Sequence, residues 1–230
     1  MIPIGDEGRL RGFPWVVCGI VALNVWVFVQ EVSAPSPDRF VNAFAMIPYD
    51  VTHDVVLPPP SPPFPPLTIV TSMFEHGGLS HIFFNMLFLL VFGPAVENST
   101  GHLRFLAFYL LCGIAGGVAQ IAVASGSHVP ALGASGAIAG VLGAYLVEFP
   151  FAQVRTIVPI GCFPLFLRLP AIVVIGIWAA TQFLNGFGTV SARAAESQGG
   201  VAYFAHIGGF CTGVLLIGLM AKKKQKSALW

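Results

Sequence analysis

The segment that decides the fold runs from Phe105 to Val147 and reads FLAFYLLCGIAGGVAQIAVASGSHVPALGASGAIAGVLGAYLV. It contains no Asp, Glu, Lys or Arg, and it is long enough for two helices that each cross a bilayer core of about 30 Å. A polar and helix-breaking stretch near its middle, SGSHVP at 125–130, predicts a turn between these helices. The segment therefore indicates a chain that crosses a membrane more than once.

The rest of the chain repeats this pattern. Four further segments lack charged side chains, and each has room for one span: 12–30, 76–96, 169–192 and 197–221. The composition agrees, because 56% of residues are hydrophobic and 9% are charged, against about a quarter charged in a soluble domain. We predict an all-α polytopic membrane protein with a bundle of six transmembrane helices at about 13–32, 79–96, 102–124, 133–149, 170–186 and 201–221. The fourth helix is short for a span.

The positions of Lys and Arg predict which side of the membrane each loop occupies. With six spans, both termini lie on one side, and Arg39 and Arg193 fall on the other. The remaining nine of the eleven basic residues lie on the side of the termini. Because short cytoplasmic loops are enriched in Lys and Arg, we predict that both termini are cytoplasmic. A short head without a transit-like leader favours a prokaryotic plasma membrane.

The same reasoning divides the chain into a short cytoplasmic N-terminus, 1–12, a six-helix membrane domain, 13–221, and a basic cytoplasmic tail, 222–230. A long external loop at 33–78 contains the proline-rich segment 58–66, PPPSPPFPP. Consecutive prolines predict an extended rod without helix. The connection from Val154 to Leu167 is predicted to lie on the cytoplasmic surface.

Four polar side chains in the predicted membrane helices form the candidate site: His81, Asn85, Ser135 and His206. Polar groups in a bilayer are costly and usually face the protein interior. The second, fourth and sixth helices all enter from the external side, which places these four side chains at one depth. Pairs of glycines four residues apart, at 136 and 140 and at 209 and 213, predict that the fourth and sixth helices touch.

Ser and His at one depth indicate nucleophilic catalysis. A serine hydroxyl becomes a useful nucleophile when an imidazole removes its proton, so we predict that Ser135 is the nucleophile and His206 the general base. Gly133 leaves room for a substrate backbone, while His81, Asn85 and the Ser135 N–H can stabilise an oxyanion. No acidic residue lies at the depth of His206, which predicts a dyad rather than a triad.

These residues lie in segments that resemble the signature motifs of the rhomboid intramembrane serine proteases. The matching segments are GASG at 133–136, AHIGG at 205–209, HIFFN at 81–85, TSMFEHGG at 71–78 and FGPAVE at 92–97. The resemblance implies a six-helix rhomboid-like bundle, a Ser135–His206 dyad and an oxyanion site at His81 and Asn85. It also implies movement of the fifth helix around Trp178 to admit substrate. The chain departs from many rhomboids in lacking a Trp-Arg pair in its first external loop.

We expect a serine endopeptidase that cleaves single-pass or polytopic membrane proteins in or near their membrane segments. No cofactor, metal or nucleic-acid partner is expected, since no His-Glu-x-x-His run is present and the net charge is only +1. Two other functions remain open. One is a catalytically silent rhomboid-like protein that binds membrane clients, and the other is a small transporter whose His and Asn side chains line a polar path.

Overall fold

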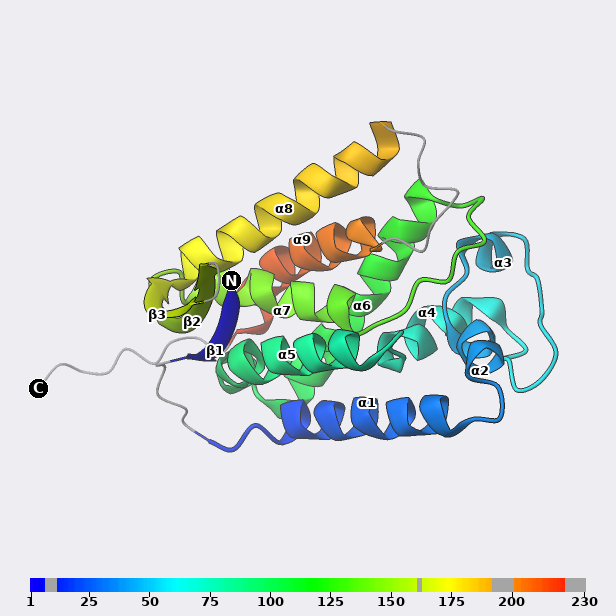
Figure 1. Ribbon diagram of the computed structural model, residues 1–230, viewed down its shortest axis with the longest axis horizontal. Coiled ribbons are helices and arrows are strands. Elements are labelled where there is room, and N and C mark those ends of the chain that lie inside the picture. Colours follow the sequence, from blue (N-terminus) through cyan, green and yellow to red (C-terminus); the bar gives the residue numbers. More distant parts are fainter. Residues whose placement is uncertain (7–11, 161–162, 192–200, 222–230) are drawn as a thin grey trace, which may run out of the picture.

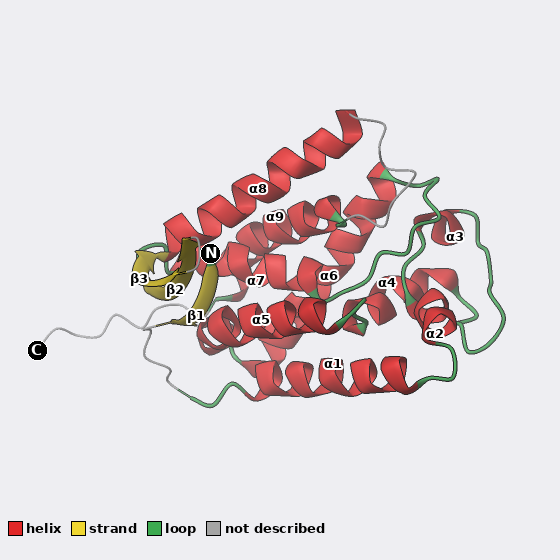
Figure 2. Ribbon diagram, viewed as in Figure 1, coloured by secondary structure: helices red, strands yellow, loops and turns green. Residues whose placement is uncertain are grey.

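The computed structural model describes residues 1–6, 12–160, 163–191 and 201–221. The predicted tail 222–230, Arg9, Arg11 and Arg193 lie outside the described residues, as does most of the loop 189–200. The described chain is mostly helical and places a small sheet at one end of the helices (Figures 1 and 2). Six helices make up the body: α1 (Trp15–Ser33), α5 (Leu79–Thr100), α6 (His102–Val123), α7 (Ser135–Glu148), α8 (Ala171–Ser191) and α9 (Tyr203–Met220).

Five of these helices, all except α7, are long and apolar enough to cross a membrane. The short fourth helix of the prediction corresponds to α7, which has 14 residues. Many large apolar side chains point away from the bundle, including Trp26 at 60%, Leu103 at 83% and Leu184 at 74% exposed. Such a surface suits lipid rather than water, so the chain is an integral multi-pass membrane protein.

Local sequence sets where several helices begin and end. Gly101 joins α5 to α6 with a φ of 93°, a left-handed conformation that glycine adopts without steric cost. At the other end of the molecule, the loop after α6 leads through Gly133 into α7. The connections therefore alternate between the two ends of the bundle.

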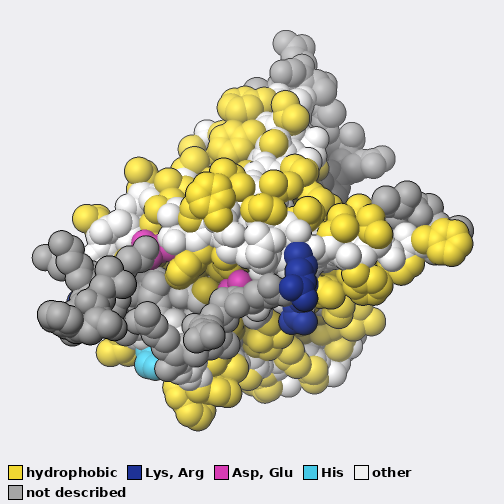
Figure 3. All heavy atoms as spheres, turned by 90° about the vertical axis from the view of Figure 1, so that its left-hand side faces the viewer, with side chains coloured by type: hydrophobic (Ala, Val, Ile, Leu, Met, Phe, Trp, Pro, Cys, Tyr) yellow, Lys and Arg dark blue, Asp and Glu magenta, His cyan; other side chains and the backbone are white. Residues whose placement is uncertain are grey.

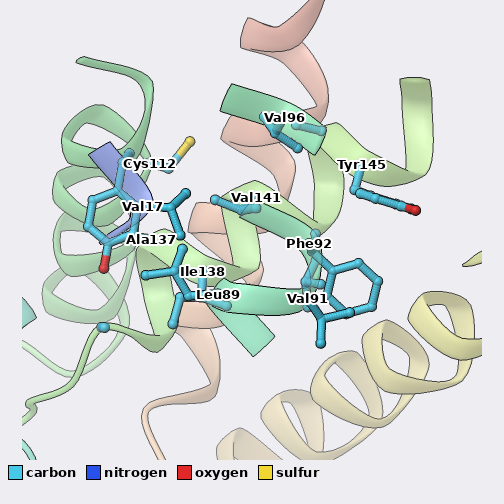
Figure 4. Close-up of a cluster of buried hydrophobic side chains, with 14 of the residues drawn as sticks. Val17, Leu89, Val91, Phe92, Val96, Cys112, Ala137, Ile138, Val141 and Tyr145 are labelled. Carbon is cyan, nitrogen blue, oxygen red and sulfur yellow. The ribbon is translucent and has the colours of Figure 1, made fainter. Parts of the chain in front are cut away.

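The core lies where α1, α5, α6 and α7 meet. Figure 4 shows this cluster, in which α5 contributes Leu89 and Phe92 and α7 contributes Val141 and Tyr145. The ring of Tyr145 packs edge-on against Phe92, with centroids 5.0 Å apart. Helix α7 is buried along most of its length, so its short sequence of small and apolar residues lies at the centre of the bundle.

The prediction of an all-α chain is wrong at one end of the molecule. Strands β1 (Ile2–Asp6), β2 (Gln153–Ile160) and β3 (Phe163–Pro170) form an antiparallel sheet in the order β1-β2-β3. Ile2 pairs with Ile157, and Arg155 pairs with Arg168. The predicted N-terminus and the predicted connection at 154–167 are therefore parts of one sheet, in which ladder hydrogen bonds satisfy the backbone.

The long loop after α1 is also more ordered than the sequence indicates. It contains α2 (Pro37–Phe44), α3 (Pro48–Thr52), η1 (Pro65–Leu67), α4 (Thr68–Thr71) and η2 (Ser72–Phe74). The predicted proline rod at 58–66 is wrong, because a turn closed by Ser61 N–H donating to the Pro58 carbonyl bends the segment, and a 3-10 helix begins at Pro65. Proline at the first turn of a helix loses no hydrogen bond.

Candidate active site

Ser135 is the first residue of α7. The chain that leads to it is fixed on both sides, because the Gly133 N–H donates to the Ser72 carbonyl at 2.8 Å and Met46 and Ala131 exchange backbone hydrogen bonds. The first N–H groups of a helix have no intrahelical acceptor. Ser135 therefore presents a hydroxyl and a backbone N–H at the same end of the helix.

His206, in the first turn of α9, lies directly beside this serine. Its Nε2 is 2.7 Å from the Ser135 Oγ, which is hydrogen-bonding distance for a hydroxyl and an imidazole. The His206 side chain is buried, with 8% of the residue exposed. The structure thus brings together the two residues that the sequence placed at one depth, although they are 71 positions apart.

Close packing of α7 against α9 makes this approach possible. A Cβ atom on Gly209 would collide with the backbone of Gly136, and one on Gly213 would collide with Gly140. On the neighbouring α6, a Cβ atom on Gly116 would come within 2.5 Å of the Ala205 carbonyl oxygen. The glycines therefore bring the backbones into contact, as predicted, and shorten the reach between Ser135 and His206.

Gly133 faces the two polar side chains of α5. A Cβ atom on Gly133 would lie 2.7 Å from His81 Nε2 and 3.6 Å from Asn85 Nδ2, so both nitrogens border the space above Gly133. Its φ of 118° also disfavours any residue with a side chain. Asn85 Nδ2 is buried and has no hydrogen-bond partner among the described residues. An unpaired buried donor is available for an acceptor that a ligand brings.

Ser135, His206, His81 and Asn85 all line one cavity of about 600 Å³. Its wall combines polar groups with large apolar side chains from α5, α7 and α8, and its lining includes His81, Phe84, Asn85, Phe88, Ser135, Leu142, Trp178 and His206. A site of this size and mixed character suits a peptide segment with an apolar side chain.

Gln182 on α8 is a contact that sequence reasoning missed. Its Oε1 lies 2.8 Å from His206 Nδ1, so both nitrogens of the imidazole have a partner. Trp178, one turn earlier, places its ring 6.0 Å from that of His206. The available signal was the amide itself, because an uncharged polar side chain inside an apolar helix requires a partner.

A second polar cluster lies behind His81. The ring of His76 packs edge-on against His81 with centroids 5.1 Å apart, and the His76 backbone N–H donates to Glu31 at 3.2 Å. Glu75 is 1% exposed, and neither of its carboxyl oxygens has a hydrogen-bond partner in the described chain. Burial and the charge of Glu31 raise the pKa of Glu75 to about 9. Burial and the neighbouring His81 lower the pKa of His76 to about 4.

The described residues contain no group of three or more His, Cys, Asp or Glu side chains that could hold a metal ion. What the site offers is a hydroxyl, an imidazole and several hydrogen-bond donors around one cavity. Acyl transfer uses this set of groups.

Residues 65–223 match the family model of the Rhomboid domain. The chain belongs to the rhomboid family. Its relatives include the mitochondrial Rhomboid protein 1 of Saccharomyces cerevisiae, which is 33% identical over 219 residues. That alignment covers 92% of this chain and 55% of the yeast protein.

Two further relatives show how broadly the similarity extends. RHOMBOID-like protein 4 of Arabidopsis thaliana is 29% identical over 229 residues, which cover 89% of this rhomboid and 52% of the plant protein. Rhomboid protease GluP of Bacillus subtilis is 45% identical over 78 residues, covering 34% of this rhomboid and 15% of GluP. This rhomboid thus spans about half the length of the yeast and plant proteins. Because its relatives are mitochondrial, plant and bacterial, the predicted prokaryotic plasma membrane stays a prediction.

Proposed function

We propose that this rhomboid is a serine endopeptidase that hydrolyses a peptide bond in or near the transmembrane segment of membrane-anchored substrates. The observation that carries the proposal is the 2.7 Å approach of Ser135 Oγ to His206 Nε2. These two atoms border a cavity that is also lined by Asn85, whose amide nitrogen has no partner within the described chain. A serine next to a base and a spare donor is the minimum arrangement for acyl transfer.

The reaction proceeds in two halves. Ser135 Oγ attacks the substrate carbonyl carbon while His206 Nε2 takes the hydroxyl proton, and the carbonyl oxygen becomes an oxyanion. His206 then gives this proton to the leaving amine, so the peptide C–N bond breaks and an ester to Ser135 remains. Water, deprotonated by the same imidazole, hydrolyses the ester and restores the serine.

The oxyanion is stabilised by donors that are in place before the reaction. His81 Nε2 and Asn85 Nδ2 border the space over Gly133, where a side chain would block the approach of the carbonyl oxygen, and the Ser135 N–H follows two residues later at the start of α7. Donors held in position in a dry site are worth far more than in water. This arrangement supports the roles given to His81, Asn85 and Gly133.

We further propose six spans, with both termini cytoplasmic and the active site near the external face. Five long apolar helices and the shorter α7 supply the spans. Arg155 and Arg168 are exposed on β2 and β3, and Figure 3, which faces the end of the molecule that bears the sheet, shows basic side chains there, all of them Arg because every Lys lies outside the described residues. The start of α7 and of α9 lies at the opposite end, so a positive cytoplasmic face puts Ser135 and His206 toward the outside.

Two rival functions are less well supported. A silent client-binding protein needs no unpaired donor beside its serine, whereas Asn85 Nδ2 is buried and has no partner in the part of the chain that the structure describes. A transporter needs a polar path through the bundle. Below the cavity, however, the centre of the bundle is filled by the fully buried side chains of Leu89, Phe92 and Tyr145. The cavity is therefore open toward one end.

The test uses the full chain in detergent and in liposomes with a single-pass membrane substrate that carries small residues near its external end. Wild type should cleave it and should form a fluorophosphonate adduct that mass spectrometry locates on Ser135. Ser135→Ala should show no adduct, and cleavage should fall by at least about 1,000-fold. Equal cleavage by both proteins would overturn the proposal. A folded wild type that neither cleaves nor forms the adduct would favour the silent protein.

A further inference from the structure

The imidazole of His206 is held from both sides by different helices. Ser135 of α7 contacts Nε2 at 2.7 Å, and Gln182 of α8 contacts Nδ1 at 2.8 Å. The side chain of Gln182 is half-buried beside this ring. The general base therefore has a fixed neighbour on the side that faces away from the serine.

The orientation of the Gln182 amide follows from its other contacts. Its nitrogen lies 3.4 Å from the Trp178 carbonyl oxygen, which can only accept a hydrogen bond, and 3.1 Å from Thr181 Oγ. The amide nitrogen therefore points along α8, and the amide oxygen faces His206. An amide oxygen is an acceptor, so His206 Nδ1 must carry the proton.

This contact selects one tautomer. With the proton on Nδ1, the lone pair of Nε2 faces the Ser135 hydroxyl, which is the form that a general base requires. A carboxylate in the same place would hold the imidazole more strongly, but it would add a charge inside the bilayer, where charges are expensive. An amide orients the ring without that charge.

We infer that Gln182 is a positioning residue that holds the proton of His206 on Nδ1 and aligns the ring with Ser135. The inference rests on the proposed function and adds a third member to the predicted dyad. Trp178, one turn away, faces the same ring, so α8 fixes both the tautomer and the plane of the base. Helix α8 lies at the outer edge of the bundle beside α9 (Figure 1). Outward displacement of α8 would thus remove this contact from His206 and slow catalysis.

The experiment compares three variants of the full chain with wild type. Gln182→Leu removes the acceptor at similar volume, and Gln182→Glu retains it and adds a charge. Asn185→Leu makes the same amide-to-apolar change at an exposed position of α8. We expect Gln182→Leu to lower kcat by about 10- to 100-fold with KM changed by less than about threefold. Asn185→Leu should match wild type in both constants.

Two readouts separate positioning from a structural role. Gln182→Glu should keep measurable activity while the acid limb of its pH–rate profile moves to higher pH, because a carboxylate favours the protonated imidazole. In ¹⁵N-histidine NMR, the His206 signal, assigned by its loss in His206→Ala, should report the Nδ1–H tautomer in wild type. A mixture of tautomers is expected in Gln182→Leu.

The outcomes distinguish this inference from the proposed function. A wild type that lacks cleavage and the Ser135 adduct would remove both. A wild type that cleaves, together with a Gln182→Leu variant of unchanged kcat, pH profile and tautomer, would overturn the inference alone. If Gln182→Leu unfolds at a lower temperature than wild type, the pH–rate profile of Gln182→Glu becomes the deciding measurement. An acid limb that does not shift in this variant would contradict the positioning role of Gln182.

Discussion

Gly209 of α9 rests directly on the backbone of Gly136 in α7, so that the Gly136 carbonyl occupies the space a Cβ atom on Gly209 would need. The two helices therefore meet backbone to backbone beside the Ser135–His206 pair, one residue after Ser135 in α7 and about one turn after His206 in α9. Any side chain at 209 must push α9 away from α7. The distance between serine and base is thus controlled by a residue that does not contact substrate.

Gly209→Val should destabilise the protein and remove activity together. Overpacking costs about 1–3 kcal/mol, and separation of the helices lengthens the Ser135–His206 contact. We expect a lower unfolding temperature in detergent and a loss of cleavage of at least about tenfold, because His206 no longer reaches Ser135. Gly218→Ala, on the same helix with no atom of the described residues within 4 Å of the added Cβ, is the control and should behave as wild type. Full activity in Gly209→Val would show that the contact is not required.

Gly133→Ala should damage catalysis more than stability. The added Cβ would fall 2.7 Å from His81 Nε2, in the region proposed for the oxyanion, and a φ of 118° strains alanine. We expect kcat to fall by about 100-fold or more, as when an oxyanion donor is lost. Gly126→Ala, in the same loop, provides the comparison, because no described atom lies within 4 Å of its added Cβ. If the two variants have the same kcat, the oxyanion assignment at Gly133 is wrong.

Much of this arrangement could be predicted because membrane topology converts sequence position into depth. Ser135 and His206 were expected to meet because both follow the external entrance of a helix, and the spaced glycines indicated which helices touch. The family match at 65–223 agrees with the motifs that carried the resemblance. The catalytic roles themselves stay predictions.

The sheet could not be predicted for a physical reason. Pro159 and Pro164 lie opposite each other in β2 and β3, and proline in a run usually argues against a strand. Strand β1, the partner of β2, comes from residues 2–6, which are far from β2 in the sequence. No local sequence pattern therefore predicts this pairing. Gln182 escaped notice for a related reason, because its partner belongs to a different helix and a single amide carries no periodic signal.

Asn85→Leu should lower catalytic activity without lowering stability, whereas a core mutation lowers stability. Because Asn85 Nδ2 is buried without a partner among the described residues, its removal abolishes an unsatisfied donor, which costs about 1–3 kcal/mol in a folded protein. We expect an unfolding temperature equal to or above that of wild type, with kcat lower by about 100-fold. Steady-state kinetics and differential scanning fluorimetry on one preparation measure both. A variant with unimpaired kcat would exclude Asn85 from the oxyanion site.

Glu75 should make stability depend on pH. Its pKa is raised to about 9 by burial and by the charge of Glu31, so the folded protein binds this proton more tightly than the unfolded chain does. The stabilising contribution is complete below an unfolded pKa near 4.5 and is lost as pH rises through 9. The wild-type unfolding temperature should therefore fall between pH 5 and pH 9.

Glu75→Gln should flatten that dependence and unfold at a higher temperature than wild type at pH 9. Asp54→Asn, which alters an exposed carboxyl in the loop after α3, should leave the wild-type slope in place. Thermal melts at pH 5, 7 and 9 provide the measurement. If wild type and Glu75→Gln show the same dependence of unfolding temperature on pH, the pKa of Glu75 does not differ between the folded and unfolded protein.

Glu97 connects the start of α1 to the last turns of α5 through hydrogen bonds, and its loss should destabilise the protein. Its two carboxyl oxygens accept hydrogen bonds from the backbone N–H groups of Val16 at 3.0 Å and Val17 at 2.8 Å, and the residue is 1% exposed. These are N–H groups of the first turn of α1, which the helix itself cannot satisfy. Glu97→Ala would leave both unpaired, at about 1–3 kcal/mol for the buried Val17 N–H and less for the partly buried Val16 N–H. We expect a clearly lower unfolding temperature for Glu97→Ala. Glu97→Gln keeps one acceptor oxygen and should give an intermediate unfolding temperature. Both variants should have a normal kcat at temperatures where they remain folded. A loss of kcat without a loss of stability would instead link this end of the bundle to the active site.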